Sequence, residues 1–219
     1  MRDHRLRNRT PLPLMSDTDD LSEILSHNAV HLCVDMQNMF ARDTEWHTPW
    51  LERVLPRVVR LVEAAPAQTI FTRFIPARNA EERQGTWRNY YRRWESLTLD
   101  RLAPEMVELV PDLARFVPPG RVVDKRVYSP WFQPELAEGL RAREVGTLVV
   151  SGGETDVCVL ATVLGAVDRG YRIVVARDAL CSSSDTTHDA MMALYSQRYG
   201  HQVDLRDTAE IVEAWPRRS

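Results

Sequence analysis

The sequence is poor in the features that mark several classes of protein. It has only three cysteines in 219 residues, Cys33, Cys158 and Cys181. They are odd in number and too far apart for a zinc site, so neither a disulfide framework nor a structural zinc is indicated. No apolar run approaches the roughly 20 residues of a membrane-spanning helix. The N-terminal residues also lack the apolar core of a signal peptide. These absences predict a reduced, cytoplasmic protein without a membrane partner.

Charge of one sign is also lacking. The 28 Lys and Arg residues are nearly balanced by 31 Asp and Glu residues, which leaves a formal net charge of −3. Such a balance gives no global attraction to nucleic acid or to an anionic membrane. With 44% apolar residues the chain can bury a substantial core, and its length suits one α/β domain.

The first 27 residues differ from the rest. They combine a basic stretch, an acidic stretch and several prolines. We expect an N-terminal extension over residues 1–27 that is either flexible or packs in an oligomer, followed by one domain over residues 28–219.

From Ala29 onward, β-branched apolar runs alternate with segments of helical periodicity. Strands are predicted at 29–35, 68–74, 121–126, 147–153, 172–178 and 202–207. Helices are predicted at 51–65, 132–144, 157–169, 185–200 and 209–215. This alternation predicts an α/β fold, a three-layer α/β/α Rossmann-like sandwich with a mostly parallel six-stranded sheet.

Residues 75–103 interrupt this alternation. They carry Trp87, Tyr90, Tyr91 and Trp94 among arginines. Arginine with aromatic residues can bind nucleic acid, but nearby acidic residues offset much of the positive charge. A lid, a pocket wall or a subunit contact is the favoured interpretation.

Three ionisable residues fall at predicted carboxyl ends of strands, where parallel α/β sheets bind ligands. They are Asp35, Lys125 and Cys158. Taken singly, each has an ordinary explanation: a turn cap, an edge lysine and a small buried apolar residue. Taken together, an acid, an amine and a thiol at one edge predict a nucleophilic site.

Cys158 has a distinctive setting, in the first turn of a predicted helix after the segment "SGGETD". The positive end of the helix dipole and a nearby lysine should favour the thiolate. Backbone N–H groups of that segment can stabilise a tetrahedral oxyanion. Cys33, inside a strand, and Cys181, in a loop, are interpreted as structural.

These motifs resemble a known family. Asp35 in "VDMQNMF", Lys125 in "DKRVYSPWF" and Cys158 in "GGETDVCVLAT" are similar to the Asp–Lys–Cys triad of isochorismatase-like cysteine hydrolases. That superfamily includes nicotinamidases, N-carbamoylsarcosine amidohydrolases, and ureidoacrylate and biuret hydrolases. The resemblance covers roughly residues 29–207.

The resemblance implies a role for each residue. Asp35 would move the proton, Lys125 would hold the thiolate and orient Asp35, and Cys158 would form an acyl-thioester. The N–H groups of Glu154 and Cys158 would form the oxyanion hole, and the Gly153–Glu154 peptide bond would be cis. Family members are usually dimers or tetramers, so a homo-oligomer is expected.

Two departures from the family refine this expectation. Nicotinamidases carry an Asp-x-His metal cluster after the second strand, and the segment 72–87 here contains no histidine. We therefore expect no metal and no cofactor, and nicotinamide is disfavoured as the substrate. Enzymes that act on isochorismate do not need a cysteine nucleophile, so Cys158 favours cleavage of a C–N bond in a small-molecule substrate.

The pocket is less well defined by the sequence. Five aromatic residues near the motifs or in the 75–103 segment are candidates for its lining, although a core role is open for each: Phe40, Trp87, Tyr128, Trp131 and Phe132. Arg73, Arg83 or Arg88 could bind a substrate carboxylate. His188 is expected to make a structural contact rather than to catalyse.

Three functions are left open by the sequence. The first is a cysteine amidohydrolase acting on a small amide, ureide or carbamoyl compound. The second is a hydrolase of the same fold that cleaves an ether or ester. The third is a catalytically silent α/β binding module.

Overall fold

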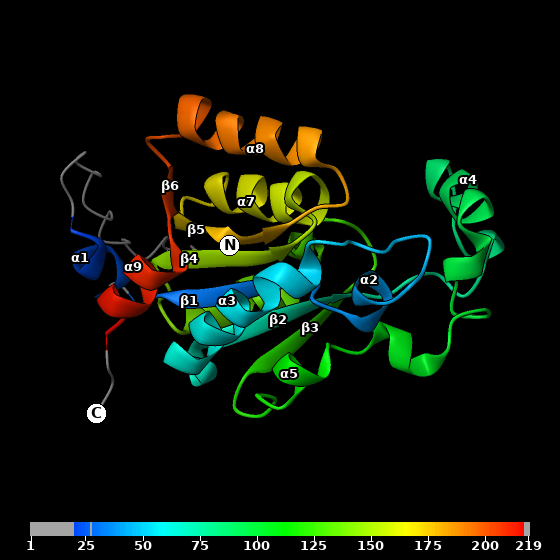
Figure 1. Ribbon diagram of the computed structural model, residues 1–219, viewed down its shortest axis with the longest axis horizontal. Coiled ribbons are helices and arrows are strands. Elements are labelled where there is room, and N and C mark those ends of the chain that lie inside the picture. Colours follow the sequence, from blue (N-terminus) through cyan, green and yellow to red (C-terminus); the bar gives the residue numbers. More distant parts are fainter. Residues whose placement is uncertain (1–19, 27, 217–219) are drawn as a thin grey trace, which may run out of the picture.

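The computed structural model describes residues 20–26 and 28–216. It contains one six-stranded sheet in which every neighbouring pair is parallel, so the predicted three-layer α/β/α fold is confirmed (Figure 1). The strands lie in the order β3-β2-β1-β4-β5-β6. Their bounds are β1 Val30–Val34, β2 Thr69–Phe74, β3 Arg121–Lys125, β4 Thr147–Gly153, β5 Arg172–Cys181 and β6 Val203–Arg206.

Helices cover both faces of this sheet (Figure 1). One core layer contains buried residues of α1 (Leu21–Ser26), α3 (Leu51–Ala64), α5 (Pro111–Ala114) and α9 (Thr208–Ala214). The other contains buried residues of α6 (Pro134–Ala142), α7 (Leu160–Val167) and α8 (Asp185–Arg198). Two further short helices are α2 (Asn38–Ala41), whose Phe40 and Ala41 pack against the first core layer, and α4 (Thr86–Arg93).

The sequence pattern explains this layering. The two central strands β1 and β4 are buried along their whole length, which matches their uninterrupted apolar sequences. Helix α3 buries one stripe with a spacing of three to four residues, which includes Leu51, Val54 and Val58. The apolar stripe faces the sheet, and the charged residues of α3 face outward.

Residues 20–26 correct the boundary that we drew at residue 27. Leu21–Ser26 form α1, whose Leu21, Ile24 and Leu25 side chains are buried in the same core cluster as α3 and α9. Thr147 at the start of β4 also donates a hydrogen bond to the Ile24 carbonyl oxygen at 2.8 Å. This turn of helix therefore packs as part of the domain. The remainder of the predicted extension lies outside the described residues.

The order of the strands creates a crevice for the site. Neighbouring strands β1 and β4 belong to the two halves of the sheet, so the chain leaves their carboxyl ends in opposite directions. Ligands of open parallel sheets bind at this topological switch point. Gly152 permits the close approach of the two strands there: its φ is +105°, and a Cβ would lie 2.1 Å from the Val34 carbonyl oxygen.

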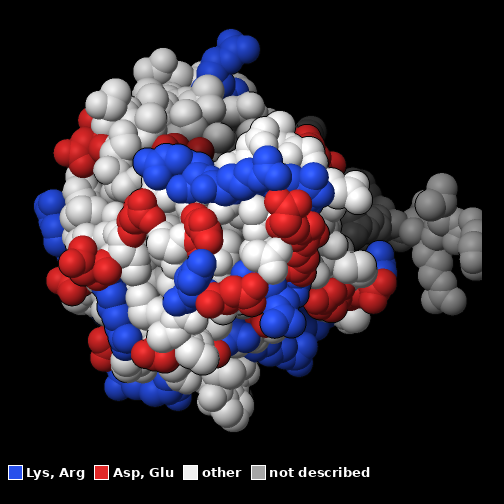
Figure 2. Space-filling model, turned by 90° about the vertical axis from the view of Figure 1, so that its right-hand side faces the viewer, with Lys and Arg blue, Asp and Glu red and all other residues white. Residues whose placement is uncertain are grey.

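The 75–103 segment with α4 extends from the body of the molecule beyond the carboxyl ends of the strands (Figure 1). Acidic and basic side chains are mixed over much of this face, and a row of basic side chains crosses its upper part (Figure 2). Several of its arginines form ion pairs, such as Arg92 with Glu81 at 2.9 Å and Arg101 with Glu95 at 3.1 Å. These ion pairs offset part of the basic charge of the 75–103 segment. No helix in the described part of the chain is long and apolar enough to cross a membrane.

Candidate active site

The three ionisable residues from the strand ends meet in one cluster. The Lys125 Nζ donates to Asp35 Oδ2 at 2.6 Å and lies 3.3 Å from the Cys158 sulfur. All three side chains are buried, with exposed fractions of 0% for Lys125, 1% for Asp35 and 7% for Cys158. The sequence separations are 90 residues and 33 residues, so the fold alone brings them together.

Asp35 lies immediately after β1 in the left-handed backbone region, with φ +50°. This conformation is uncommon for a residue with a side chain. Its backbone N–H donates to the Thr72 carbonyl oxygen at 3.2 Å, and Thr72 Oγ1 donates to Asp35 Oδ1 at 2.5 Å. Strand β2 therefore fixes one carboxylate oxygen, and Lys125 holds the other.

Lys125 is the last residue of β3, the edge strand, and is paired with Phe74 of β2. Its long side chain crosses β2 to reach Asp35, and its ammonium lies 5.1 Å from the centre of the Phe74 ring. Burial acts to lower the pKa of Lys125, but the Asp35 carboxylate and the Cys158 sulfur outweigh it, so the pKa lies above its usual value. The ammonium therefore remains charged inside the protein.

Cys158 lies in a single π-helical turn, Thr155–Val159, that joins β4 to α7. We expected the helix start and the lysine to favour the thiolate. Instead burial raises the pKa of the Cys158 thiol, although Lys125 opposes this effect. Desolvation outweighs the charge of the cation because the sulfur is nearly enclosed. Burial therefore favours the protonated thiol over the thiolate in the resting cluster.

The peptide bond between Gly153 and Glu154 is cis. It stands at the end of β4, immediately before the π-helical turn, where the resemblance placed it. The oxyanion-hole roles of the Glu154 and Cys158 N–H groups remain predictions.

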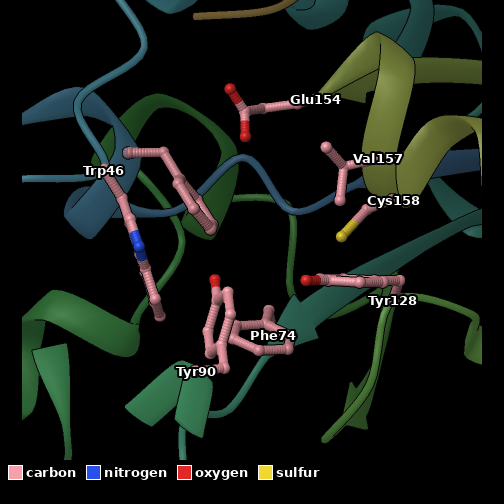
Figure 3. Close-up of a pocket in the computed structure, with 8 residues that line it drawn as sticks. Trp46, Phe74, Tyr90, Tyr128, Glu154, Val157 and Cys158 are labelled. Carbon is pink, nitrogen blue, oxygen red and sulfur yellow. The ribbon is translucent and has the colours of Figure 1, made fainter. Parts of the chain in front are cut away.

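A cavity opens over the Cys158 sulfur (Figure 3). Figure 3 shows the hydroxyls of Tyr90 and Tyr128 pointing into it and the Glu154 carboxylate directed toward it from the opposite side. Burial raises the pKa of both phenols, so they are neutral. The residues that line the cavity are Phe40, Trp46, Phe74, Tyr90, Tyr128, Glu154, Val157 and Cys158.

Of the five aromatic residues proposed from the sequence, Phe40 and Tyr128 line this cavity and three do not. Trp87 lies one layer behind the wall, 5.2 Å from the Tyr90 ring and 5.0 Å from the Tyr128 ring. Trp131 is buried against α7, and its Nε1 donates to the Thr162 carbonyl oxygen at 2.8 Å. Phe132 points outward and is 76% exposed. Proximity to Lys125 in the sequence was misleading because the chain turns away from the sheet edge after Tyr128.

The three arginines proposed for a substrate carboxylate have other partners. Arg73 forms ion pairs with Asp124 at 2.8 Å and Glu108 at 2.5 Å. Arg83 donates to the Arg126 carbonyl oxygen, and Arg88 donates to the Arg83 carbonyl oxygen at 3.1 Å. None of the three lines the cavity.

His188 makes the expected kind of structural contact. Its Nδ1 lies 2.9 Å from Thr155 Oγ1, whose hydroxyl donates to the Cys181 carbonyl oxygen at 3.0 Å. His188 therefore donates to Thr155 from Nδ1 and steadies the turn that carries Cys158, while its ring packs 5.0 Å from Trp50.

Three aromatic lining residues were missed by the sequence analysis as pocket candidates. Phe74 is the last residue of β2, so the strand-end rule that selected Lys125 also points to it. Trp46 lies in the loop between α2 and α3, and Tyr90 lies in α4. In the sequence, Trp46 is indicated only as an aromatic residue in the loop after the first strand. Tyr90 is indicated only by the aromatic content of the 75–103 segment.

Within the part of the chain that the structure describes, no group of three or more His, Cys, Asp and Glu side chains is arranged to hold a metal ion.

Comparison with known proteins places this chain in a family. The family model for the isochorismatase domain matches residues 29–207. The chain therefore belongs to the isochorismatase family.

Among individual relatives, an uncharacterized isochorismatase family protein PncA of Bacillus subtilis is 35% identical over 81 residues, 37% of this chain and 44% of the relative. The maleamate amidohydrolase of Pseudomonas putida is 32% identical over 89 residues, 41% of this chain and 42% of the relative. The matches thus span less than half the length of these two relatives.

A crystal structure of a cysteine hydrolase from Pseudomonas syringae pv. phaseolicola has the same fold. It superimposes with a TM-score of 0.73 at 24% identity, covering 94% of this chain and 98% of that one.

Proposed function

We propose that this protein is a cofactor-independent cysteine hydrolase that cleaves a C–N bond in a small amide, ureide or carbamoyl compound. The observation that carries this proposal is the position of Lys125, whose ammonium is within 2.6 Å of a carboxylate and 3.3 Å of a thiol at the base of a cavity. A thiol that shares a cluster with a proton acceptor and a cation can serve as a nucleophile.

The proposed reaction starts from the neutral thiol. Asp35 accepts the thiol proton as Sγ of Cys158 attacks the carbonyl carbon, and Lys125 stabilises the sulfur while its charge is negative. The N–H groups of Glu154 and Cys158 stabilise the tetrahedral oxyanion. Asp35 then gives the proton to the leaving nitrogen, and the C–N bond breaks to release ammonia or an amine.

The second half of the reaction regenerates the enzyme. A water molecule loses a proton to Asp35 and attacks the acyl-thioester carbon. The C–S bond breaks, the thiolate recovers the proton from Asp35, and the carboxylic or carbamic acid leaves. Burial raises the pKa of the Cys158 thiol, which suits a cycle that starts from the protonated thiol. In this cycle Cys158 donates the proton and Asp35 accepts it.

The similarity to a protein named maleamate amidohydrolase supports the choice of a C–N bond. The neutral hydrogen-bond donors on Tyr90 and Tyr128 and the small aromatic-lined cavity support a small substrate. We expect the same protein to use no nucleic acid or membrane partner and to form a homo-oligomer in the cytoplasm.

The proposal is tested by a screen for ammonia or amine release over small amides, ureides and carbamoyl compounds. Cys158→Ser should abolish release while the fold is retained, as judged by circular dichroism. The matched control is Cys181→Ser, a buried thiol outside the cavity, which should keep turnover. Activity that survives in Cys158→Ser would overturn the cysteine mechanism.

The alternatives give different results in the same screen. Turnover of esters or vinyl ethers without any amide would indicate the non-amide hydrolase. The absence of turnover, together with a Cys158 thiol no more reactive than Cys33, would indicate a silent binding module.

A further inference from the structure

The cavity over Cys158 contains an acidic side chain. The Glu154 carboxylate is directed toward the cavity (Figure 3), and its Oε1 accepts a hydrogen bond from the Ser183 backbone N–H at 2.9 Å. This hydrogen bond comes from the loop after β5 and fixes the carboxylate at the opening. The negative charge therefore has a defined position above the nucleophile.

Positive charge in the cavity is already compensated. Of the described residues, those that line the cavity include no lysine or arginine. Lys125 lies at the base behind Cys158, and it is held by Asp35 at 2.6 Å. The charges of Asp35 and Lys125 cancel, so the Glu154 carboxylate sets the sign of the potential that a ligand meets.

The remaining wall is aromatic and continuous. Trp46 lies 5.8 Å from Phe74, 5.9 Å from Tyr90 and 6.1 Å from Phe40, measured between ring centres. The faces of such rings attract cations, and aromatic cages beside a carboxylate recognise ammonium groups. A carboxylate ligand would meet both repulsion from Glu154 and the loss of its hydration without a compensating cation.

We propose that Glu154 and the aromatic wall select substrates that carry an ammonium group a few atoms from the scissile bond and reject substrates that carry a carboxylate at that place. Selection among substrates rests on the proposed hydrolase function. The selection of charge by the cavity is independent of turnover and can be measured without it.

The first experiment uses methanethiosulfonate reagents of three charges, which form a mixed disulfide with an accessible cysteine. The probes are the cationic 2-aminoethyl, the neutral methyl and the anionic 2-sulfonatoethyl reagents. Peptide mass mapping gives the rate at Cys158, and each rate is divided by that of the same reagent with a free thiol. We expect the cationic reagent to exceed the anionic one by about tenfold or more, since one charge acts across a few ångströms of partly desolvated space.

Glu154→Gln keeps the backbone N–H and the ability to accept from Ser183. It should reduce the ratio of cationic to anionic rates by about tenfold. The control is Glu138→Gln, which removes one charge from an exposed position of α6 and should leave the ratio unchanged. A wild-type ratio of one or less, or a ratio unaffected by Glu154→Gln, would overturn the inference.

The second experiment uses three primary amides of matched length, 4-aminobutanamide, succinamide and succinamate, which are cationic, neutral and anionic. We expect kcat/KM to fall in that order and the order to flatten in Glu154→Gln. Failure to hydrolyse any of them, with the reagent selectivity intact, would count against the proposed function alone. Preferred hydrolysis of succinamate would count against the charge selection alone.

Discussion

Two polar clusters are buried in the protein, one at the carboxyl ends of the strands and one inside the sheet, and they differ in what they can do. One is the triad cluster of Asp35, Lys125 and Cys158. The other, the His31 cluster, joins His31 of β1 to Ser151 of β4 at 2.7 Å and to Thr69 of β2 at 3.4 Å. Members of the His31 cluster are fully buried, and burial lowers the pKa of His31 to about 3. This second cluster is neutral and enclosed, and its hydrogen bonds satisfy polar groups inside the sheet.

The comparison shows that burial and hydrogen bonding do not make a reactive site. The triad cluster contains an ammonium and a carboxylate, and its thiol borders a cavity. It lies at the carboxyl ends of the strands, whereas His31 lies near the amino end of β1. Position at the switch point gives the triad cluster access to a ligand, which the His31 cluster lacks.

The largest effect is expected when the charge balance of the triad cluster is broken. Lys125→Met keeps a long side chain but leaves the Asp35 carboxylate buried without a cation. We expect unfolding free energy to fall by about 3–5 kcal/mol and turnover to fall by about 10²–10⁴-fold. Chemical denaturation and ammonia release measure the two effects.

The double variant Asp35→Asn with Lys125→Met is the control for stability. It removes both charges and should regain part of the stability lost in Lys125→Met, while remaining inactive. If Lys125→Met were as stable as the wild type, the ammonium would not be compensating a buried carboxylate.

A smaller effect is expected in the alkylation rates of the two cysteines that lie beside the clusters. Cys158 borders the cavity, whereas Cys33, which follows His31 in β1, is fully enclosed. Iodoacetamide should alkylate Cys158 of the folded protein at least about 100-fold faster than Cys33, because enclosed thiols are protected. The rate at Cys158 should still rise through pH 9, because burial raises its pKa and the thiolate fraction keeps growing. Equal alkylation rates at the two cysteines, read by peptide mass mapping, would contradict the difference in accessibility between Cys158 and Cys33.

The smallest effect tests the neutrality of the His31 cluster. The pKa of His31 is about 3 in the folded protein against a usual value of 6.5. The unfolded chain therefore binds a proton that the folded one excludes, and stability falls as the pH drops below 6.5. At pH 5.5 this amounts to about 1.4 kcal/mol.

His31→Gln should remove that part of the pH dependence between pH 8 and pH 5.5, while His201→Gln, at an exposed position, should not. Denaturation curves at the two pH values provide the measurement. An identical pH dependence in His31→Gln and the wild type would mean that His31 is not held neutral.

The sequence predicted the triad cluster and the sheet, but only part of the cavity. Strand ends are set by local apolar patterns, so Asp35, Lys125 and Cys158 could be assigned to one edge before the structure was known. The pKa of Cys158 could not be predicted, because desolvation depends on the packing of Tyr90, Tyr128 and their neighbours. Position in a helix and a neighbouring cation argued for a thiolate, and burial reversed the direction.

The cavity wall could not be predicted because it is assembled from loops. Trp46 and Tyr90 belong to segments separated by β2, and their rings approach to 5.9 Å only in the folded chain. Trp131 and Phe132 were nearer to Lys125 in sequence and lie elsewhere. The boundary at residue 27 failed for a similar reason, since the six-residue α1 shows its buried face only when α9 and β4 are in place.

The central claim is that Cys158 forms a covalent bond to the substrate. The most direct measurement is rapid acid quenching during turnover of the amide that is hydrolysed fastest, followed by peptide mass mapping. The account predicts an acyl mass on the Cys158 peptide that disappears in Cys158→Ser. Continued hydrolysis by Cys158→Ser, with no acyl group on the Cys158 peptide of the wild type, would contradict it.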